Sequence, residues 1–110
     1  QPHRYTRTQY CWNEFLTCFT GVEVLHMVDI YPASEEPIQG VTGESLAAAI
    51  HKHGHVRVEF HAEMSDAVEA VLRGLRAGDG LLTIGAGSVA KAAEELAERL
   101  PAAMGVTHAG

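Results

Sequence analysis

A nearly continuous apolar run over residues 22–30 is the feature that most constrains how this chain folds. Only Glu23, His26 and Asp29 interrupt it. Strands with this pattern are usually covered by protein on both faces, as in parallel sheets with helices packed on either side. The run therefore favours an α/β domain, in which His26 is expected to be a hydrogen-bonded core histidine.

Helical and strand-like segments alternate along the rest of the chain. Apolar residues at helical spacing predict helices between residues 6 and 20, 42 and 53, 65 and 77, and 88 and 100. Residues 56–60 alternate and predict a strand near a sheet edge, whereas residues 81–84 predict a short buried strand. The tail after Met104 is expected to fray.

This order predicts one domain over residues 1–110, a three-layer Rossmann-like parallel sheet with helices on both faces. Three strands are few for this class, and the chain opens on a helix. We therefore expect that a strand leads into residue 1 and that the chain is an excised domain.

Charge and composition narrow the function. The net charge of −6 argues against nucleic acid as the main partner, because phosphate binding needs a basic face. No apolar run is long enough to span a bilayer. Cys11 and Cys18 would lie roughly 10 Å apart along one helix, which is too far for a disulfide. They are expected to be the reduced thiols of a cytosolic protein.

Residues 1–8, Gln-Pro-His-Arg-Tyr-Thr-Arg-Thr, concentrate polar chemistry in one short stretch. Thr6 and Gln9 have the spacing of a capping box and predict the start of a helix. Cations at a helix N-terminus oppose its dipole, so we expect an anion to lie among them. The cationic or titratable side chains are His3, Arg4 and Arg7.

Two further loops are expected to lie beside residues 1–8. Residues 31–38 and 85–88 follow predicted strands directly. In an open parallel sheet, ligands bind beyond the carboxyl ends of the strands. The sequence therefore predicts a candidate site at one sheet edge, where three loops meet.

Residues 85–90 also match G-x-G-x-x-[GA], a dinucleotide-binding pattern that is weak by itself. The acidic residue expected on the next strand is missing, because no strand is predicted after residue 100. No phosphate-binding P-loop is present. Two interpretations stay open: glycines that only permit a tight turn, or a nest of amides aided by Ser88 that binds a carboxylate or phosphate.

Histidines and paired carboxylates suggest weaker hypotheses. His51, His53 and His55 fit no common zinc spacing, so no metal site is expected. Glu35 and Glu36 are adjacent and usually point apart, which disfavours paired acid–base chemistry. They are expected to be solvated, or one of them to meet the cationic stretch.

Three blocks resemble the C-terminal domain of the UDP-N-acetylmuramate–L-alanine ligases, a branch of the Mur ligase family. The first is residues 1–8, a stretch that other Mur ligases do not carry. The second is residues 29–38, similar to D-[VI]-Y-x-A-G-E-x-P-I, with Ser34 where that pattern has glycine. The third combines Gly78 and Asp79 with residues 81–87. The blocks keep the family's order across nearly the whole chain.

The resemblance implies a concrete function. Such a ligase joins L-alanine to UDP-N-acetylmuramate in the bacterial cytoplasm, with ATP and Mg²⁺, through an acyl phosphate in peptidoglycan precursor synthesis. Its central domain holds the P-loop and most of the magnesium site, and an N-terminal domain completes the enzyme. The C-terminal domain closes over the central one and brings the amino acid, so this chain alone is expected to be inactive.

The resemblance also implies site residues. Arg4 and Arg7 would be catalytic and, with His3, would line the amino-acid site. Tyr31, Gly85, Ala86, Gly87 and Ser88 complete the predicted substrate-binding set, and no residue is predicted to bind metal. Two alternatives stay open: a related ligase that recycles a murein tripeptide, and a non-catalytic nucleotide-binding α/β module.

Overall fold

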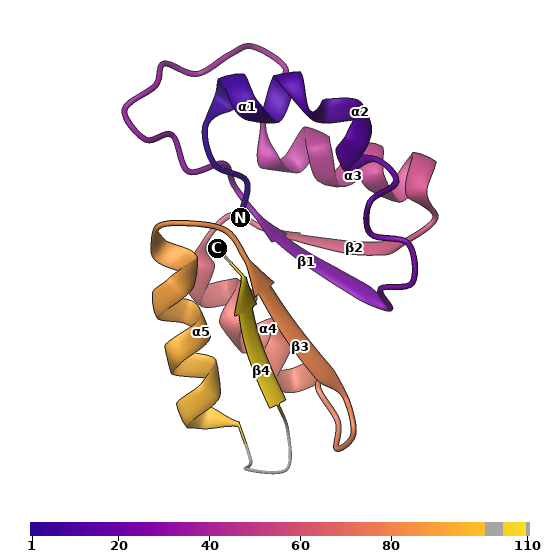
Figure 1. The fold of residues 1–110 in the computed structure, drawn as a ribbon, viewed down its shortest axis with the longest axis vertical. Helices are drawn as coiled ribbons and strands as arrows, with labels where there is room; N and C mark the ends of the chain where they lie inside the picture. Colours follow the sequence, from indigo (N-terminus) through magenta and orange to yellow (C-terminus); the bar gives the residue numbers. More distant parts are fainter. Residues whose placement is uncertain (101–104, 110) are drawn as a thin grey trace.

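The computed structural model describes residues 1–100 and 105–109, which form helices and parallel strands in an α/β arrangement (Figure 1). The helices are α1 (Tyr5–Tyr10), α2 (Trp12–Phe15), α3 (Gly43–Gly54), α4 (Met64–Gly74) and α5 (Ser88–Arg99). The strands are β1 (Val24–Val28), β2 (Arg57–His61), β3 (Gly80–Ile84) and β4 (Gly105–Ala109). The predicted fold class is confirmed.

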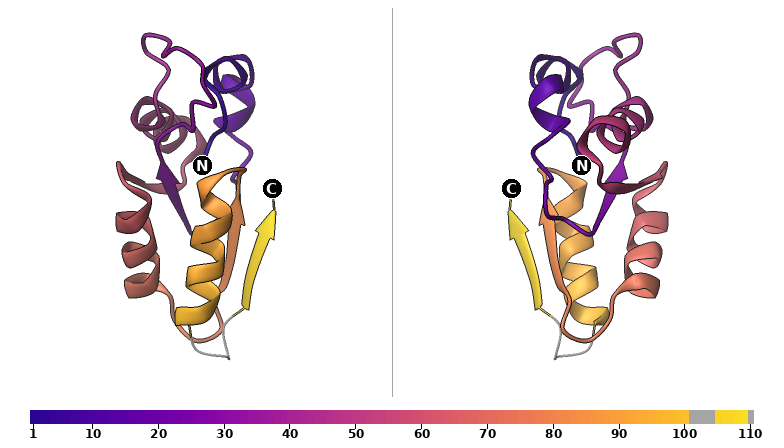
Figure 2. Two further views of the ribbon diagram at one scale, coloured as in Figure 1. Left: turned by 90° about the vertical axis from the view of Figure 1, so that its left-hand side faces the viewer. Right: turned by 90° about the vertical axis from the view of Figure 1, so that its right-hand side faces the viewer.

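The strands form two parallel pairs, β1 with β2 and β3 with β4. The expectation of one continuous sheet is not met within the described residues, because no strand joins β1 to β3. Figure 1 shows the two pairs set apart from one another, with α1, α2 and α3 beside the first pair and α5 beside the second, and the side views in Figure 2 show the same separation. Helix α4 packs against the first pair and also against α5.

A groove of about 950 Å³ separates β1 from β3. Its walls are largely apolar side chains of β1, β3, α4 and α5, among them Val24, Val68, Leu81, Val89 and Leu96. The N-terminal residues Gln1 to His3 line one end of this groove, and the backbone of His3 pairs in parallel with that of Tyr31. The Gln1 amino group donates to the Ile84 carbonyl there, at 3.0 Å. A strand leading into residue 1 would run along the groove, and that expectation stays a prediction.

Helix α3 builds the first core. Its apolar stripe places Leu46 and Ile50 fully out of solvent against Met27 of β1, and Trp12 and Phe15 of α2 pack around them. Thr42 caps the helix by accepting from the Ser45 N–H at 3.0 Å, and the Ser45 hydroxyl accepts from the Thr42 N–H in return. Such reciprocal caps satisfy two of the donors that a helix start leaves unpaired. The predicted start of this helix is confirmed.

The second core lies between α4 and α5. Val68 and Val71 of α4 face Ala92 and Leu96 of α5, and Leu81 of β3 packs against them. Small residues on α5 let the two helices approach closely. Arg99, the last residue of α5, donates to Glu69 in the middle of α4 at 2.8 Å. This exposed pair adds little stability by itself, because surface ion pairs are worth about 0–1 kcal/mol.

Three local predictions at the ends of the chain were wrong. The first helix divides at Cys11, and Thr6 does not cap it, because α1 begins at Tyr5 with no side-chain cap. Residues 105–109 do not fray but form β4, whose backbone pairs with β3. A strand therefore follows α5, although none was predicted after residue 100.

Ser65 also does not cap α4, which begins at Met64 with Glu63 at the N-cap. The strand predicted to be buried at residues 81–84 is partly exposed, because Leu82 and Ile84 are 55% and 50% exposed. Cys11 and Cys18 are both free thiols. Within residues 1–100 and 105–109, no helix has the length and apolar character needed to cross a membrane.

Candidate functional site

Gln1 joins the three loops that the sequence places at one edge. Its side-chain amide donates to the Asp29 carbonyl at 3.2 Å, just beyond β1. The amide oxygen accepts from the Ser88 hydroxyl at 2.9 Å, at the start of α5. The structure therefore brings the segments 1–4, 31–35 and 85–88 together beyond the carboxyl ends of β1 and β3. The sequence indicated Gln1 only as the first residue of the octapeptide at residues 1–8. It did not predict that Gln1 bridges the loops.

Tyr31 forms the centre of this junction. Its ring stacks on the His3 ring with centroids 5.3 Å apart and planes 9° from parallel. On another side, a Cβ added to Gly87 would lie 3.4 Å from the Tyr31 ring. Glycine thus lets the α5 loop approach the aromatic pair closely. Tyr31 remains 37% exposed, so its ring stays accessible from solvent.

The Arg4 backbone is held from both sides in an unusual conformation. Its φ is +71°, which L-residues other than glycine seldom adopt. Its N–H donates to the Tyr31 carbonyl at 2.8 Å. Its carbonyl accepts from the buried Thr8, from the hydroxyl at 2.7 Å and the N–H at 3.2 Å. Residues held in such regions cluster at functional sites, where surrounding contacts maintain them.

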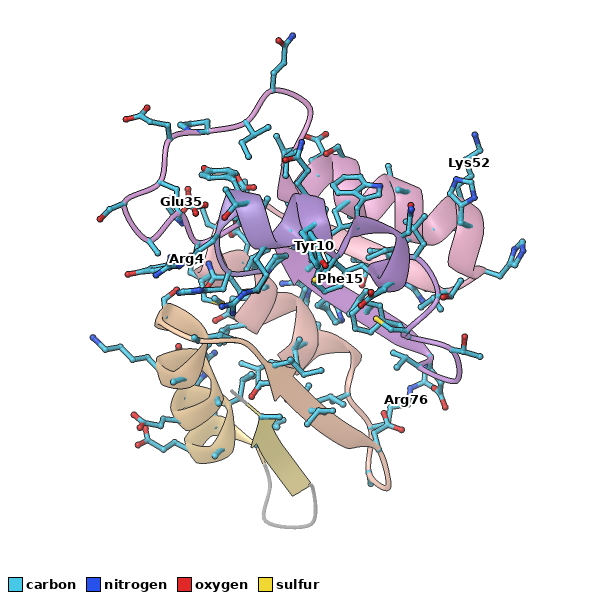
Figure 3. All side chains as sticks on the ribbon, turned by 45° about the horizontal axis from the view of Figure 1, so that its top comes forward. Arg4, Tyr10, Phe15, Glu35, Lys52 and Arg76 are labelled. Atoms are coloured by element: carbon cyan, nitrogen blue, oxygen red, sulfur yellow. The ribbon has the colours of Figure 1, made fainter. Side chains whose placement is uncertain are left out.

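Glu35 meets the cationic stretch, as one of the two acidic residues was expected to do. Its carboxylate accepts from the Thr6 hydroxyl at 2.6 Å and from the Thr6 N–H at 3.1 Å. These hydrogen bonds lower the pKa of the Glu35 carboxyl, and the Arg4 charge lowers it slightly further. Figure 3 shows Arg4 and Glu35 close together beside the start of α1.

The two predicted catalytic arginines take different positions. Arg7 and His3 line the end of the groove between the strand pairs, whereas Arg4 lies outside its lining. Both arginines are exposed. In the part of the chain that the structure describes, neither guanidinium forms a hydrogen bond or ion pair. Their donors are therefore available to an anionic ligand.

The glycine loop after β3, residues 85–87, packs closely against Gln1 at this junction. Gly85 has φ +139°, and a Cβ there would lie 2.7 Å from the Gln1 carbonyl oxygen. Its N–H donates to the Ala109 carbonyl, and the Ser88 hydroxyl donates to Gln1. These groups are thus engaged within the protein, which favours the tight-turn interpretation. Ala86 lines the end of the groove beside Gly85.

The dinucleotide pattern also lacks its second half. Although β4 follows α5, residues 105–109 read Gly-Val-Thr-His-Ala and include no acidic side chain. The dinucleotide fold uses such a residue to hold the ribose hydroxyls. The structure therefore gives the nucleotide-module alternative little support.

His51, His53 and His55 form no metal-binding group in the described part of the chain. His51 pairs with the Val56 carbonyl at 3.1 Å and does not meet His53 or His55 around a common centre. Nor can any group of three or more histidine, cysteine, aspartate or glutamate residues within this part of the chain hold a metal ion.

A different histidine pair lies across β1 and β2. His26 Nδ1 is 3.1 Å from His61 Nε2, with the rings 5.3 Å apart, and 3.6 Å from the Glu59 carboxylate. Burial lowers the pKa of His26, and the positive charge of His61 and Arg57 adds to this, whereas Glu59 opposes it. His26 is hydrogen-bonded as predicted, but it is half-buried and not a core residue.

The chain is similar in sequence to several proteins that share one name. The chain is 45% identical over 100 residues to a protein of Geotalea daltonii named UDP-N-acetylmuramate–L-alanine ligase, covering 91% of this chain and 22% of that protein. Ligases of the same name from Rickettsia massiliae and Trichlorobacter lovleyi are each 44% identical, over 101 and 100 residues. These alignments again cover 91% of this chain, and 21% and 22% of the relatives.

The chain thus spans about a fifth of the length of the curated relatives it matches. A scan against protein-family models finds none that matches.

Proposed function

Because this chain is homologous to UDP-N-acetylmuramate–L-alanine ligases over 91% of its length, we propose that it forms the C-terminal domain of such a ligase. The observation that carries the proposal is this identity, which extends over nearly the whole chain. The meeting of the three loops at one edge supports it, because the family-like residues lie there. As in most α/β folds, such an edge is where ligands bind.

In this proposal the complete enzyme joins L-alanine to the lactyl carboxylate of UDP-N-acetylmuramate in the bacterial cytoplasm. ATP activates the carboxylate as an acyl phosphate, and the alanine amine then displaces phosphate. The product would feed peptidoglycan synthesis, and with it cell shape and division. The resemblance assigns the Mg²⁺ site mainly to the central domain of such an enzyme.

Arg4 and Arg7 are proposed to bind the anionic groups of this reaction. A guanidinium suits a carboxylate because its paired N–H donors match the two oxygens. It also stabilises the charge that develops on a transferred phosphoryl group. Both side chains are exposed, and neither forms an ion pair within the part of the chain that the structure describes, which fits either role. The His3 ring stacks on the Tyr31 ring, which fixes the imidazole at the same junction.

The murein tripeptide ligase remains the alternative enzyme. It would place the same chemistry on a peptide instead of a single amino acid. Measuring the turnover of the complete ligase with L-alanine and, separately, with the tripeptide distinguishes the two enzymes. The module alternative requires the isolated chain to bind adenosine nucleotides.

Substitution of the arginines in the complete ligase tests the site. Arg4→Ala and Arg7→Ala are each expected to reduce kcat/KM by one to two decades, because a charge-assisted hydrogen bond is worth roughly 1.5–3 kcal/mol. An arginine that binds alanine should raise KM for L-alanine, whereas one that serves the acyl phosphate should lower kcat. Arg→Lys should not fully restore activity, since an ammonium lacks the planar fork.

Arg76→Ala is a matched control, because Arg76 is also exposed but lies in the loop before β3, far along the chain from the junction. It should retain normal kinetics. Wild-type constants in both the Arg4 and Arg7 variants would show that the octapeptide is only structural. The isolated chain should show no ATP turnover with the two substrates, because it has no P-loop.

A further inference from the structure

Helix α1 follows Arg4, its N-cap residue, and contains Arg7, but few contacts within the helix stabilise it. It spans 6 residues, and its N-cap contributes no side-chain hydrogen bond. Helices this short are not stable in isolation, because nucleation costs more than a few hydrogen bonds return. The N–H groups of its first turn also have no carbonyl partner within the helix. Contacts from elsewhere in the chain must therefore fix its first turn.

Glu35 supplies this contact from the loop after β1. Its carboxylate accepts from both the N–H and the hydroxyl of Thr6, at 3.1 and 2.6 Å. The Tyr5 N–H also contributes to lowering the pKa of Glu35, so the carboxylate faces the first turn as a whole. Glu35 is thus an external cap for α1, separated from Thr6 by 29 residues of sequence.

A tight turn delivers Glu35 to that position. The Glu35 N–H donates to the Pro32 carbonyl at 3.0 Å. The two residues between them, Ala33 and Ser34, have φ of +50° and +69°. Two successive positive φ values are typical of a type I′ turn, which reverses the chain within four residues. The same loop begins at Tyr31, whose carbonyl holds the Arg4 N–H, so one loop grips the arginine segment at two points.

Arg4 lies between these two points in its strained conformation. Tyr31 holds its N–H on one side, and Glu35 holds Thr6 two residues beyond on the other. Without the second grip, the backbone at Arg4 can relax toward a negative φ, which would redirect its side chain. The position of the Arg4 guanidinium therefore depends on Glu35, although no hydrogen bond joins their side chains among those found in the described residues.

We propose that Glu35 is a positioning residue, which fixes the Arg4 guanidinium toward its anionic ligand by clamping Thr6 at the start of α1. This inference rests on the proposed function of Arg4. It differs from an acid–base role, because the Glu35 carboxylate is already occupied by two donors from Thr6. It also separates Glu35 from its neighbour Glu36, which is exposed and forms no hydrogen bond within the part of the chain described.

A double-mutant cycle in the complete ligase tests the proposal. Glu35→Ala is expected to lower kcat/KM for L-alanine roughly ten-fold, since both hydrogen bonds to the charged carboxylate are lost. The same substitution in an Arg4→Ala background should cost less than about two-fold, because the residue being positioned is already absent. Glu36→Ala is the matched control and should leave the kinetics unchanged.

Less severe variants identify the clamped atoms. Glu35→Gln keeps the side chain's size and should retain most of the activity if hydrogen bonding, and not charge, does the positioning. Thr6→Val removes the hydroxyl and should reproduce part of the Glu35→Ala loss, whereas Thr6→Ser should restore it. If Glu35→Ala fails to fold, the Thr6→Val and Arg4→Ala cycle measures the same coupling.

Hydrogen exchange provides a readout that is independent of activity. Glu35→Ala should increase exchange at the Thr6 amide while leaving the Ile50 amide of α3 unchanged. Equal losses from Glu35→Ala with and without Arg4 would overturn the positioning role, as would unchanged Thr6 exchange. Normal kinetics in both arginine variants would instead overturn the proposed function, so the two failures are distinguishable.

Discussion

The side chain of Asp29 accepts a hydrogen bond from the Gly43 N–H at 2.9 Å and so joins the end of β1 to the first turn of α3. A Cβ at Gly43 would lie 2.7 Å from the Asp29 Cα and 2.8 Å from the Val28 carbonyl oxygen. Both obstacles are backbone atoms, which cannot move aside cheaply. Gly43→Ala is therefore expected to lower the free energy of unfolding by about 1–3 kcal/mol, measured by urea denaturation.

Gly74 provides the control for this prediction. It also belongs to a helix, at the end of α4, but a Cβ there would meet nothing within 4 Å. Gly74→Ala should leave stability unchanged or raise it by up to about 1 kcal/mol, because alanine is the better helix former. Equal effects at the two glycines would show that α3 and β1 do not approach as closely as described.

At Ser34, in contrast to Gly43, a change to or from glycine is expected to act in the opposite direction: introducing glycine should not destabilise the fold. It stands where the resembling family has glycine, and its φ of +69° explains that preference. Ser34→Gly is expected to be neutral or to raise the free energy of unfolding by up to about 1 kcal/mol, whereas Ser34→Val should lower it. Ser65→Gly, within helix α4, should instead cost about 0.5 kcal/mol. Stabilisation by Ser34→Val would contradict the assigned turn.

The histidine pair predicts a dependence of stability on pH. Burial lowers the pKa of folded His26 below its unfolded value of about 6.5. As the pH falls through that unfolded value, the unfolded chain takes up a proton before the folded one does. Stability should therefore be highest above about pH 6.5 and decline below it, with a slope of at most about 1.4 kcal/mol per pH unit for one proton.

His26→Asn should flatten this decline, even if it lowers stability throughout. His53→Asn is the control, since His53 is exposed on α3. Urea denaturation at several pH values between 5 and 8 compares the three proteins. A decline that is unchanged in His26→Asn would assign the titration to another group.

Local patterns predicted much of this fold because they act within a few residues. The start of α3 at Thr42 follows from capping chemistry, whereas its left-handed C-cap residue is His55 and not the predicted Gly54. The meeting of three loops follows from the rule that ligands bind beyond the carboxyl ends of parallel strands. His3, Tyr31 and Glu35 were named from the sequence, whereas the bridging role of Gln1 was missed. The orientation of each side chain at that edge could not be predicted, since it depends on hydrogen bonds such as those of Gln1.

The errors have a common cause in tertiary contacts. Residues 105–109 have no strong apolar alternation, and pairing with β3 makes them a strand. Thr6 has the sequence of a capping residue, yet its hydroxyl donates to Glu35, a residue that local spacing cannot bring near. The apolar stripe likewise does not predict that the first helix divides at Cys11, because the helical spacing of apolar residues continues through it.

The groove between the strand pairs leads to the last prediction. An apolar segment of about five residues added before Gln1 should run along the groove and pair with β1 and β3, each of which is 5 residues long. Burial lowers the pKa of the Gln1 amino group, and an extension replaces this ammonium with a neutral amide. Burying several Val or Ile side chains gains about 1.5–3 kcal/mol each, and ordering costs about 1–2 kcal/mol per residue.

The net expectation is that a Val/Ile extension gives a higher free energy of unfolding than a Gly/Ser extension of the same length. A Gly/Ser extension of the same length is the control, and it should leave stability unchanged because it offers no side chains to the apolar walls. Hydrogen exchange should slow at Leu25 of β1 and Leu82 of β3 in the first protein only. Equal stabilisation by both extensions, or a dimer formed by the apolar one, would show that the groove does not accept a single strand that leads into Gln1.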